Sequence, residues 1–260
     1  LGAVDPATGA TVPWNAANTV KNSGMSSAVT SLVAGNDSLY GTGYVFGVDP
    51  GLPKGNLEGS FAASANSGDI RWVNSCHGDS YGTFPFKGAS YSVGHAHDCR
   101  DTRGFPQTNP WTHQRGIAMT DYPTQTSRKT VLTDYFNWEG TQSPSELPWY
   151  PDLEAGTFTG QQQAAWSISG NSDYVVLGGE FGRVNGERQQ GLVRFARKGL
   201  APNASGPLLQ GPNFQPALTS PATGLVRGSI PAYYAADNDK LSYFFFNDTA
   251  TTEIYTATLR

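Results

Sequence analysis

The two cysteines of the chain and three of its four histidines fall within one stretch, CHGDSYGTFPFKGASYSVGHAHDC, which runs from Cys76 to Cys99. Histidine, cysteine and aspartate are side chains that bind zinc or serve as acids and bases in catalysis. Paired cysteines also form disulfides in secreted proteins. The stretch therefore indicates either a metal or catalytic site or a closed structural hairpin.

A tight turn in the middle of this stretch predicts how its two halves pair. Lys87 and Gly88 suit the two central positions of a hairpin turn, since glycine at the second position tolerates a left-handed backbone. With that turn, Cys76 lies directly opposite Cys99. Opposed Cβ atoms in a hairpin are close enough for a disulfide after a small adjustment. We therefore predict a disulfide between the two cysteines.

The same register distributes the candidate ligands over both faces of the hairpin. Strand alternation places His95 and His97 on the face of the cysteines and His77, Asp79 and Asp98 on the other. A zinc site needs three or four ligands in one place. We expect no metal, cofactor or catalytic site here, although metal binding by the two histidines of one face stays open. His77 is expected to form a cross-strand pair with Asp98.

The composition favours an all-β protein. Charged residues make up only 15% of the chain, whereas it contains 31 glycines, 17 prolines, 12 tyrosines and 13 phenylalanines, which are turn formers and β-favouring aromatics. The net charge of −4 leaves no broad cationic surface for nucleic acid. No stretch approaches the roughly 20 apolar residues of a membrane span. We expect neither partner.

Three similar segments indicate a repeat: YGTGYVF (40–46), YSVGHAH (91–97) and VVLGGEF (175–181). Their glycines at 43, 94 and 178 are 51 and 84 positions apart, and a β-propeller blade needs about 40 to 50 residues. The run 137–156 supplies the insertion for the longer step. The predicted units are the tail of one blade (1–24) and three further blades (25–75, 76–160 and 161–200). His97 takes the place of Phe46 and Phe181, which predicts a buried ring.

A family resemblance supports this interpretation. The segments DYVVLGGEFGRVNGERQQGLVRFA (173–196) and VDPATGATVPW (4–14) resemble blades of the secreted, repeat-built β-propellers of actinobacteria, which are related to the delta-sixty repeats. The resemblance covers roughly residues 1–200. It implies a partial propeller of about three and a half blades in an extracellular or cell-surface protein, and the family transfers no catalytic residues.

The remaining residues predict a change of domain. A linker (201–222) is followed by TGLVRGSIPAYYAADNDKLSY (223–243), which resembles the first strands of a bacterial immunoglobulin-like or cadherin-like β-sandwich module. In such modules aspartates equivalent to Asp237 and Asp239, in the hairpin with Leu241 and Tyr243, can help to bind calcium. Two carboxylates are too few for a site, and a solvated turn is the simpler interpretation.

The last residues of the chain resemble a translated sequencing adapter. The decapeptide NDTATTEIYT (247–256) matches, codon by codon, the translation of a short-read sequencing adapter. We therefore expect residues 244–260 to be an assembly artefact. We also expect the chain to be a fragment, with further blades upstream.

Two functions from different classes follow. The principal hypothesis is a non-enzymatic extracellular scaffold or adhesion module that binds glycans or cell-wall components. The alternative is a carbohydrate-active hydrolase or lyase whose catalytic residues lie in the missing blades or on the insertion. The insertion carries carboxylates that could serve as an acid/base pair in such an enzyme: Glu139, Glu146, Asp152 and Glu154. Its aromatic residues, Trp138, Trp149 and Tyr150, can either stack on sugars or pack against the blade. His113, which is isolated in the sequence, is expected to be structural.

Overall fold

The computed structural model of the chain describes residues 1–35, 37–197, 199–201, 217–223, 225–229, 242–246 and 254–258. The chain divides into two compact units, Leu1–Leu200 and Ala201–Arg260. Within the described residues the helical elements are one turn of α-helix, α1 (Ala16–Thr19), and one 3-10 turn, η1 (Arg100–Thr102). The remaining regular structure consists of antiparallel strands, so the predicted all-β class is confirmed.

Two four-stranded sheets form most of the first unit. After the hairpin of β1 (Ala3–Val4) and β2 (Thr11–Val12), the first sheet has the order β3-β4-β5-β6. The second has the order β12-β9-β8-β7. The bounds are β3 (Ser27–Gly35), β4 (Ser38–Val45), β5 (Gly59–Ser64), β6 (Ile70–Asn74), β7 (Ser80–Phe86), β8 (Ala89–Ala96), β9 (Gln114–Thr120) and β12 (Glu146–Leu147).

A third sheet, of order β13-β14-β17, follows in the chain. Two short strand pairs accompany the sheets, β10 with β11 and β15 with β16. The bounds are β10 (Gln125–Thr126), β11 (Gln142–Ser143), β13 (Ala165–Gly170), β14 (Tyr174–Gly179), β15 (Arg183–Val184), β16 (Glu187–Arg188) and β17 (Leu192–Ala196).

The three sheets share one irregularity at an equivalent place. In each, the first strand carries one extra residue opposite the second strand: Thr30 in β3, Tyr81 in β7 and Trp166 in β13. The residue before each bulge pairs with a glycine, at 43, 94 and 179. A one-residue bulge bends its strand and strengthens the local twist. β4, β8 and β14 thus each carry a glycine opposite the residue that precedes the bulge.

The bulges correct the third segment of the sequence alignment by one residue. Gly179, and not Gly178, is the structural equivalent of Gly43 and Gly94. The predicted burial of the His97 ring is confirmed, since His97 is 2% exposed, but the two residues aligned with it differ from each other. Phe181 is buried as expected, but the side chain of Phe46 is 80% exposed, because it follows the end of β4 and enters a loop.

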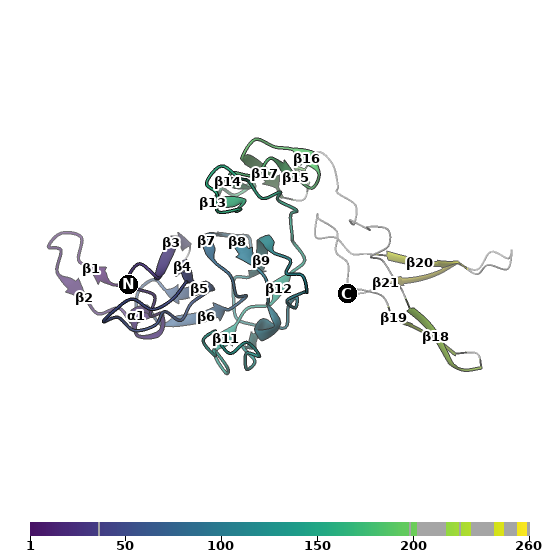
Figure 1. Cartoon of the computed structure of the whole chain (residues 1–260), viewed down its shortest axis with the longest axis horizontal. Coiled ribbons are helices and arrows are strands. Elements are labelled where there is room, and N and C mark those ends of the chain that lie inside the picture. Colours follow the sequence, from purple (N-terminus) through teal and green to yellow (C-terminus); the bar gives the residue numbers. More distant parts are fainter. Residues whose placement is uncertain are drawn as a thin grey trace. The chain divides into compact units, whose positions relative to one another are not determined.

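The sheets pack on one another in chain order, with β7 against β3 and β4 and β13 against β7 and β8 (Figure 1). The bulged residues join them. The Thr30 hydroxyl donates a hydrogen bond to the backbone oxygen of Ser80 over 2.6 Å. The rings of Tyr81 and Trp166 lie 4.6 Å apart. The bulges are thus contact points between successive sheets as well as bends within them.

The second unit contains two strand pairs, β18 (Ala217–Ala222) with β19 (Leu225–Ser229) and β20 (Ser242–Phe246) with β21 (Ile254–Thr258). The predicted aspartates Asp237 and Asp239 and the neighbouring Leu241 lie outside the described residues, as do 247–253. Among the residues that the structure describes, no helix is long and apolar enough to cross a membrane.

Candidate functional site

The hairpin from Cys76 to Cys99 has the predicted turn and the predicted disulfide. Lys87 and Gly88 connect β7 to β8 with φ values of 49° and 83°, the left-handed pair that a type I′ turn requires. Cys76 and Cys99 are joined, and both are buried. They pack with Ala96, Ile117 and Met119 in a small apolar cluster.

The bulge at Tyr81 changes the register beyond it, so the predicted distribution of ligands over two faces is wrong. Near the turn the strands pair as predicted, with Gly82 opposite Val93. Past the bulge, the amide of His97 donates to the carbonyl of His77 over 3.0 Å. His77 therefore lies opposite His97 and not on the other face.

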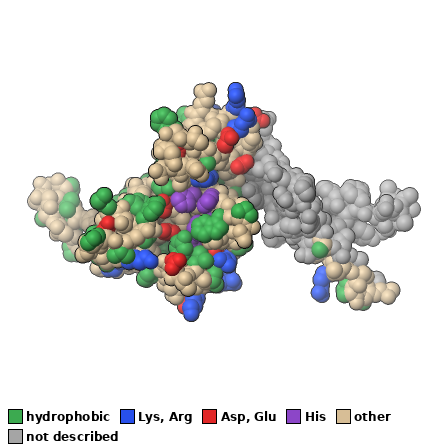
Figure 2. Space-filling model, in the orientation of Figure 1, with side chains coloured by type: hydrophobic (Ala, Val, Ile, Leu, Met, Phe, Trp, Pro, Cys, Tyr) green, Lys and Arg blue, Asp and Glu red, His purple; other side chains and the backbone are tan. Residues whose placement is uncertain are grey.

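All four histidines consequently come together. The ring centroids of His77 and His97 are 6.3 Å apart, and His113 lies 5.5 Å from His95 and 6.1 Å from His97. In Figure 2 the histidine side chains that reach the surface (purple) lie together, whereas His77 and His97 are buried. We call His77, His95, His97 and His113 the histidine cluster. His113 is isolated in the sequence but reaches the cluster because it directly precedes β9, whose Gln114 pairs with Ala96 at the end of β8.

The carboxylate partner of His77 also differs from the prediction. Its Nε2 atom is 3.2 Å from Oδ2 of Asp101, on the 3-10 turn. Asp98 instead forms a salt bridge with Arg100. The backbone of His77 has a φ of 44°, an uncommon conformation for a residue other than glycine. His77 and Asp98, which were predicted to pair with each other, thus have different partners.

His97 is enclosed by aromatic side chains. Its ring stacks on Trp111 with a centroid distance of 4.4 Å, and its Nε2 atom is 3.2 Å from the hydroxyl of Tyr135. The Nδ1 atoms of His77 and His97 are buried and have no hydrogen-bond partner within the described part of the chain. Burial, followed by the neighbouring histidines, lowers the pKa of His97 to about 4. His97 is therefore neutral at pH 7.

In the regions that the structure describes, no three histidine, cysteine or acidic side chains are grouped so that they could hold a metal ion. The ring nitrogens of His95 are 3.1 Å from the Gln163 amide oxygen and 3.2 Å from the Asp79 backbone nitrogen. These contacts explain a structural role for His95 without a ligand.

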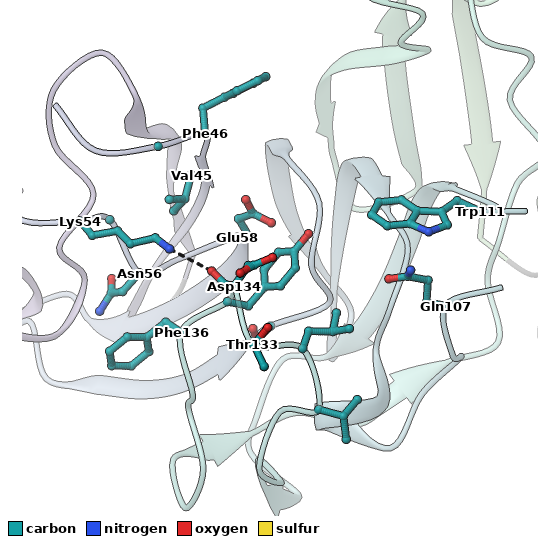
Figure 3. A pocket seen from close by; sticks show the side chains of 16 residues that line it. Val45, Phe46, Lys54, Asn56, Glu58, Gln107, Trp111, Thr133, Asp134 and Phe136 are labelled. Atoms are coloured by element: carbon teal, nitrogen blue, oxygen red, sulfur yellow. Dashed lines mark hydrogen bonds between the residues drawn. The ribbon is translucent and has the colours of Figure 1, made fainter. Parts of the chain in front are cut away.

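A pocket of about 430 Å³ adjoins the histidine cluster. Trp111 and Tyr135, which contact His97, also line this pocket. Three loops build it: the β4–β5 loop, the segment between η1 and β9, and the segment between β10 and β11. We call it the loop pocket. Figure 3 shows Trp111 and Gln107 on one side and Phe46 and Phe136 on the other, with Glu58 between them. Its other lining residues are Val45, Gly47, Lys54, Gly55, Asn56, Ser75, Val131, Leu132, Thr133, Asp134 and Tyr135.

The loop pocket combines exposed rings with polar groups. Trp111 is 53% exposed and Phe136 50% exposed. The ammonium group of Lys54 donates to the backbone oxygen of Asp134 over 2.9 Å, and the Glu58 carboxylate accepts from the amide of Gly78 over 3.0 Å. The rings can contact apolar ligand surface while the polar groups fix its orientation.

Two groups in the loop pocket hold their protons more firmly than usual. Burial and the negative charge of Asp79 raise the pKa of Glu58, against the opposing effects of its hydrogen bonds and of His77. Burial raises the pKa of Tyr135 to about 12, and the carboxylates of Glu58, Asp134, Asp79 and Asp98 add to the rise. The phenol therefore remains protonated at neutral pH in a surrounding of negative charge.

The carboxylates of the 137–156 insertion are attached to different parts of the fold. Glu146 accepts a hydrogen bond from the amide of Phe105 over 3.0 Å, and burial raises its pKa. Glu154 faces Arg183 at 3.8 Å. Glu139 and Asp152 are exposed. Glu146 and Glu154 therefore have separate partners.

Two aromatic residues of the insertion, Trp138 and Trp149, pack inside the protein, whereas Tyr150 is half-buried. Trp138 is 4% exposed and donates from Nε1 to the backbone oxygen of Asn56 over 3.0 Å. Trp149 is 7% exposed and belongs to the largest apolar cluster. Tyr150 lies 5.9 Å from Phe105, ring to ring.

The loop pocket is not predictable from a local motif, because its residues come from three loops without one in common. Trp111, Glu58 and Tyr135 lie far apart in the sequence, and no spacing relates them. The one available signal was the presence of aromatic and polar residues together in long connections, where binding residues are frequent.

Comparison of the chain with protein-family models, with curated proteins and with solved structures returned no match.

Proposed function

We propose that the protein is an extracellular, non-enzymatic scaffold or adhesion module that binds glycans or cell-wall polymers in the loop pocket. The observation that carries the proposal is the presence of exposed aromatic rings on both sides of a pocket whose centre holds polar groups. The C–H faces of a sugar ring are apolar and stack on aromatic side chains, while the hydroxyl groups at its rim need hydrogen-bond partners. A pocket that offers both suits a saccharide.

The chemistry of the lining supports the recognition of a sugar. Trp111 and Phe136 present ring surface to the solvent. Gln107 and Thr133 provide amide and hydroxyl groups that can donate to or accept from saccharide hydroxyls. The disulfide supports an extracellular location, since disulfides persist in oxidising compartments.

We propose further that the three sheets are successive blades of a partial β-propeller. The shared bulge opposite a glycine and the packing of each sheet on the next support this assignment. Neither feature is required of unrelated antiparallel sheets. A crystal structure of the whole chain tests the assignment, because the blades of a propeller are arranged radially around a common channel.

Binding to a panel of soluble cell-wall oligosaccharides, measured by calorimetry on the whole chain, tests the proposed function. Trp111→Ala and Phe136→Ala should each weaken binding about tenfold or more, since each removes a stacking ring. Tyr122→Ala is the matched control, because Tyr122 is 56% exposed and does not line the loop pocket. Equal affinity of all variants would contradict the proposal. Turnover of a bound oligosaccharide would favour the hydrolase or lyase alternative instead.

A further inference from the structure

Negative charge outweighs positive charge in the loop pocket. Glu58 and Asp134 line it, whereas Lys54 is its one lining cation among the described residues. The ammonium group of Lys54 is already engaged by the backbone oxygen of Asp134. Asp79 and Asp98 lie close enough to act on the Tyr135 phenol together with the two lining carboxylates. These carboxylates would therefore repel an anionic ligand in the loop pocket.

His97, which contacts the pocket residues Trp111 and Tyr135, does not compensate this charge. His97 is neutral at pH 7, because burial and the neighbouring histidines lower its pKa. Burial likewise lowers the pKa values of His95 and His113. The negative field at the inner wall of the loop pocket is therefore opposed by few charges of the protein itself.

The aromatic walls of the loop pocket also favour a positively charged ligand. The faces of Trp, Tyr and Phe rings attract cations, with the strongest attraction at Trp. Trp111 and Phe136 lie on opposite sides of Glu58 in Figure 3. A cation next to Glu58 would have ring faces and a carboxylate within the same pocket, and the carboxylate would gain a partner of opposite charge.

From this combination we propose that the loop pocket selects glycans that carry free ammonium groups, such as de-N-acetylated amino-sugar polymers, over neutral and acidic glycans. The sugar ring stacks on the aromatic walls, and the ammonium group lies next to Glu58. The inference rests on the proposed glycan-binding function and adds the class of glycan to it.

Three hexasaccharides compared by calorimetry on the whole chain at pH 6, where a primary amine is protonated, test this inference: β-1,4-linked glucosamine, the same oligomer fully N-acetylated, and galacturonate. The glucosamine oligomer should bind about tenfold more tightly than the N-acetylated one. Hexalysine is the fourth probe and should bind more weakly than the glucosamine oligomer, because it has no sugar ring to stack.

Two variants and one control identify the groups responsible. Glu58→Gln keeps an acceptor for the Gly78 amide and should abolish the preference, because it removes the negative charge next to which the ammonium group lies. Lys54→Gln, at an exposed position, should increase the preference several-fold because it removes the one competing cation. Glu139→Gln changes an exposed carboxylate outside the loop pocket and should behave like the unaltered protein. Melting curves establish that each variant is folded.

The possible outcomes distinguish the preference for amino sugars from glycan binding in general. Equal affinity for the first two oligomers, tighter binding of galacturonate or of hexalysine, or weaker glucosamine binding by Lys54→Gln overturns the amino-sugar assignment. Binding of the N-acetylated oligomer alone does so as well, but leaves the glycan-binding function in place. Failure of all three oligosaccharides to bind overturns both.

Discussion

The imidazole of His97 is buried against Trp111 and Tyr135 and has a pKa of about 4, whereas an exposed histidine titrates near 6.5. As the pH falls below 6.5, the unfolded chain therefore takes up a proton that the folded protein resists. The free energy of unfolding should fall between pH 6.5 and pH 4, by at most about 3 kcal/mol from this group. Below pH 4 both states are protonated, and no further loss is expected from it.

Urea unfolding at a series of pH values checks this dependence. His97→Gln retains a side chain that can bond to Tyr135, and it should flatten the curve between pH 6.5 and pH 4. The control His113→Gln alters the exposed member of the histidine cluster and should have a smaller effect. An unchanged slope in His97→Gln would show that another group causes the pH dependence.

Glu58 provides a residue-scale prediction of opposite sign. Burial and Asp79 raise the pKa of its carboxyl group, so the ionised form is disfavoured in the folded protein. The folded state should lose stability from this group as the pH rises through its raised pKa. Glu58→Gln should therefore raise the melting temperature at pH 7, but leave it unchanged at pH 3, where both states are protonated. A lower melting temperature at pH 7 would contradict this account.

Among the elements, the β7–β8 hairpin depends on its disulfide. Cys76 and Cys99 enclose a loop with a sequence separation of 23. In the chain-entropy description, closing a loop of this size stabilises the fold by about 3 kcal/mol. The double variant Cys76→Ala/Cys99→Ala should lose about that amount in urea unfolding under oxidising conditions. Reduction of the unaltered protein should give a similar loss, whereas the double variant should not respond to reductant.

The bulges make a second prediction for the elements, with a control in the same strand. A Cβ atom at Gly179 would lie 2.0 Å from the backbone oxygen of Ala164, but one at Gly178 would have nothing within 4 Å. Gly179→Ala should therefore destabilise the protein by about 2 kcal/mol, as overpacking does, and Gly178→Ala by less than about 0.5 kcal/mol. Equal effects of the two substitutions in thermal unfolding would contradict the proposed role of the bulge.

At the scale of the first unit, the bulged residues connect neighbouring sheets. Trp166 of the third sheet packs on Tyr81 of the second. Trp166→Ala should destabilise the unit by about 3 kcal/mol, the usual cost of removing a packed aromatic side chain. Phe158→Ala is the control, since Phe158 is 96% exposed. If Trp166→Ala melts like the unaltered protein, the sheets do not stabilise one another through this contact.

Much of the local structure was predictable from the sequence. The strand-forming composition determined the all-β class, and Lys87-Gly88 determined the turn and the register next to it, because a two-residue turn fixes which residues face each other. The disulfide followed from that register. It forms in the structure although a bulge intervenes, since the cysteines lie at the end of the hairpin, where the chain adjusts to join them.

Only the tertiary structure decided the positions of the histidines and the loop pocket. One extra residue at Tyr81 reverses which side chains share a face, and nothing in the letters YGTF distinguishes a bulged residue from a paired one. The loop pocket brings together loops that are far apart in the sequence. Their proximity depends on how the sheets pack, and local sequence patterns carry no information about that packing. The sequence by itself determined strands, turn and disulfide, because these depend on near neighbours, whereas the candidate site depends on distant ones.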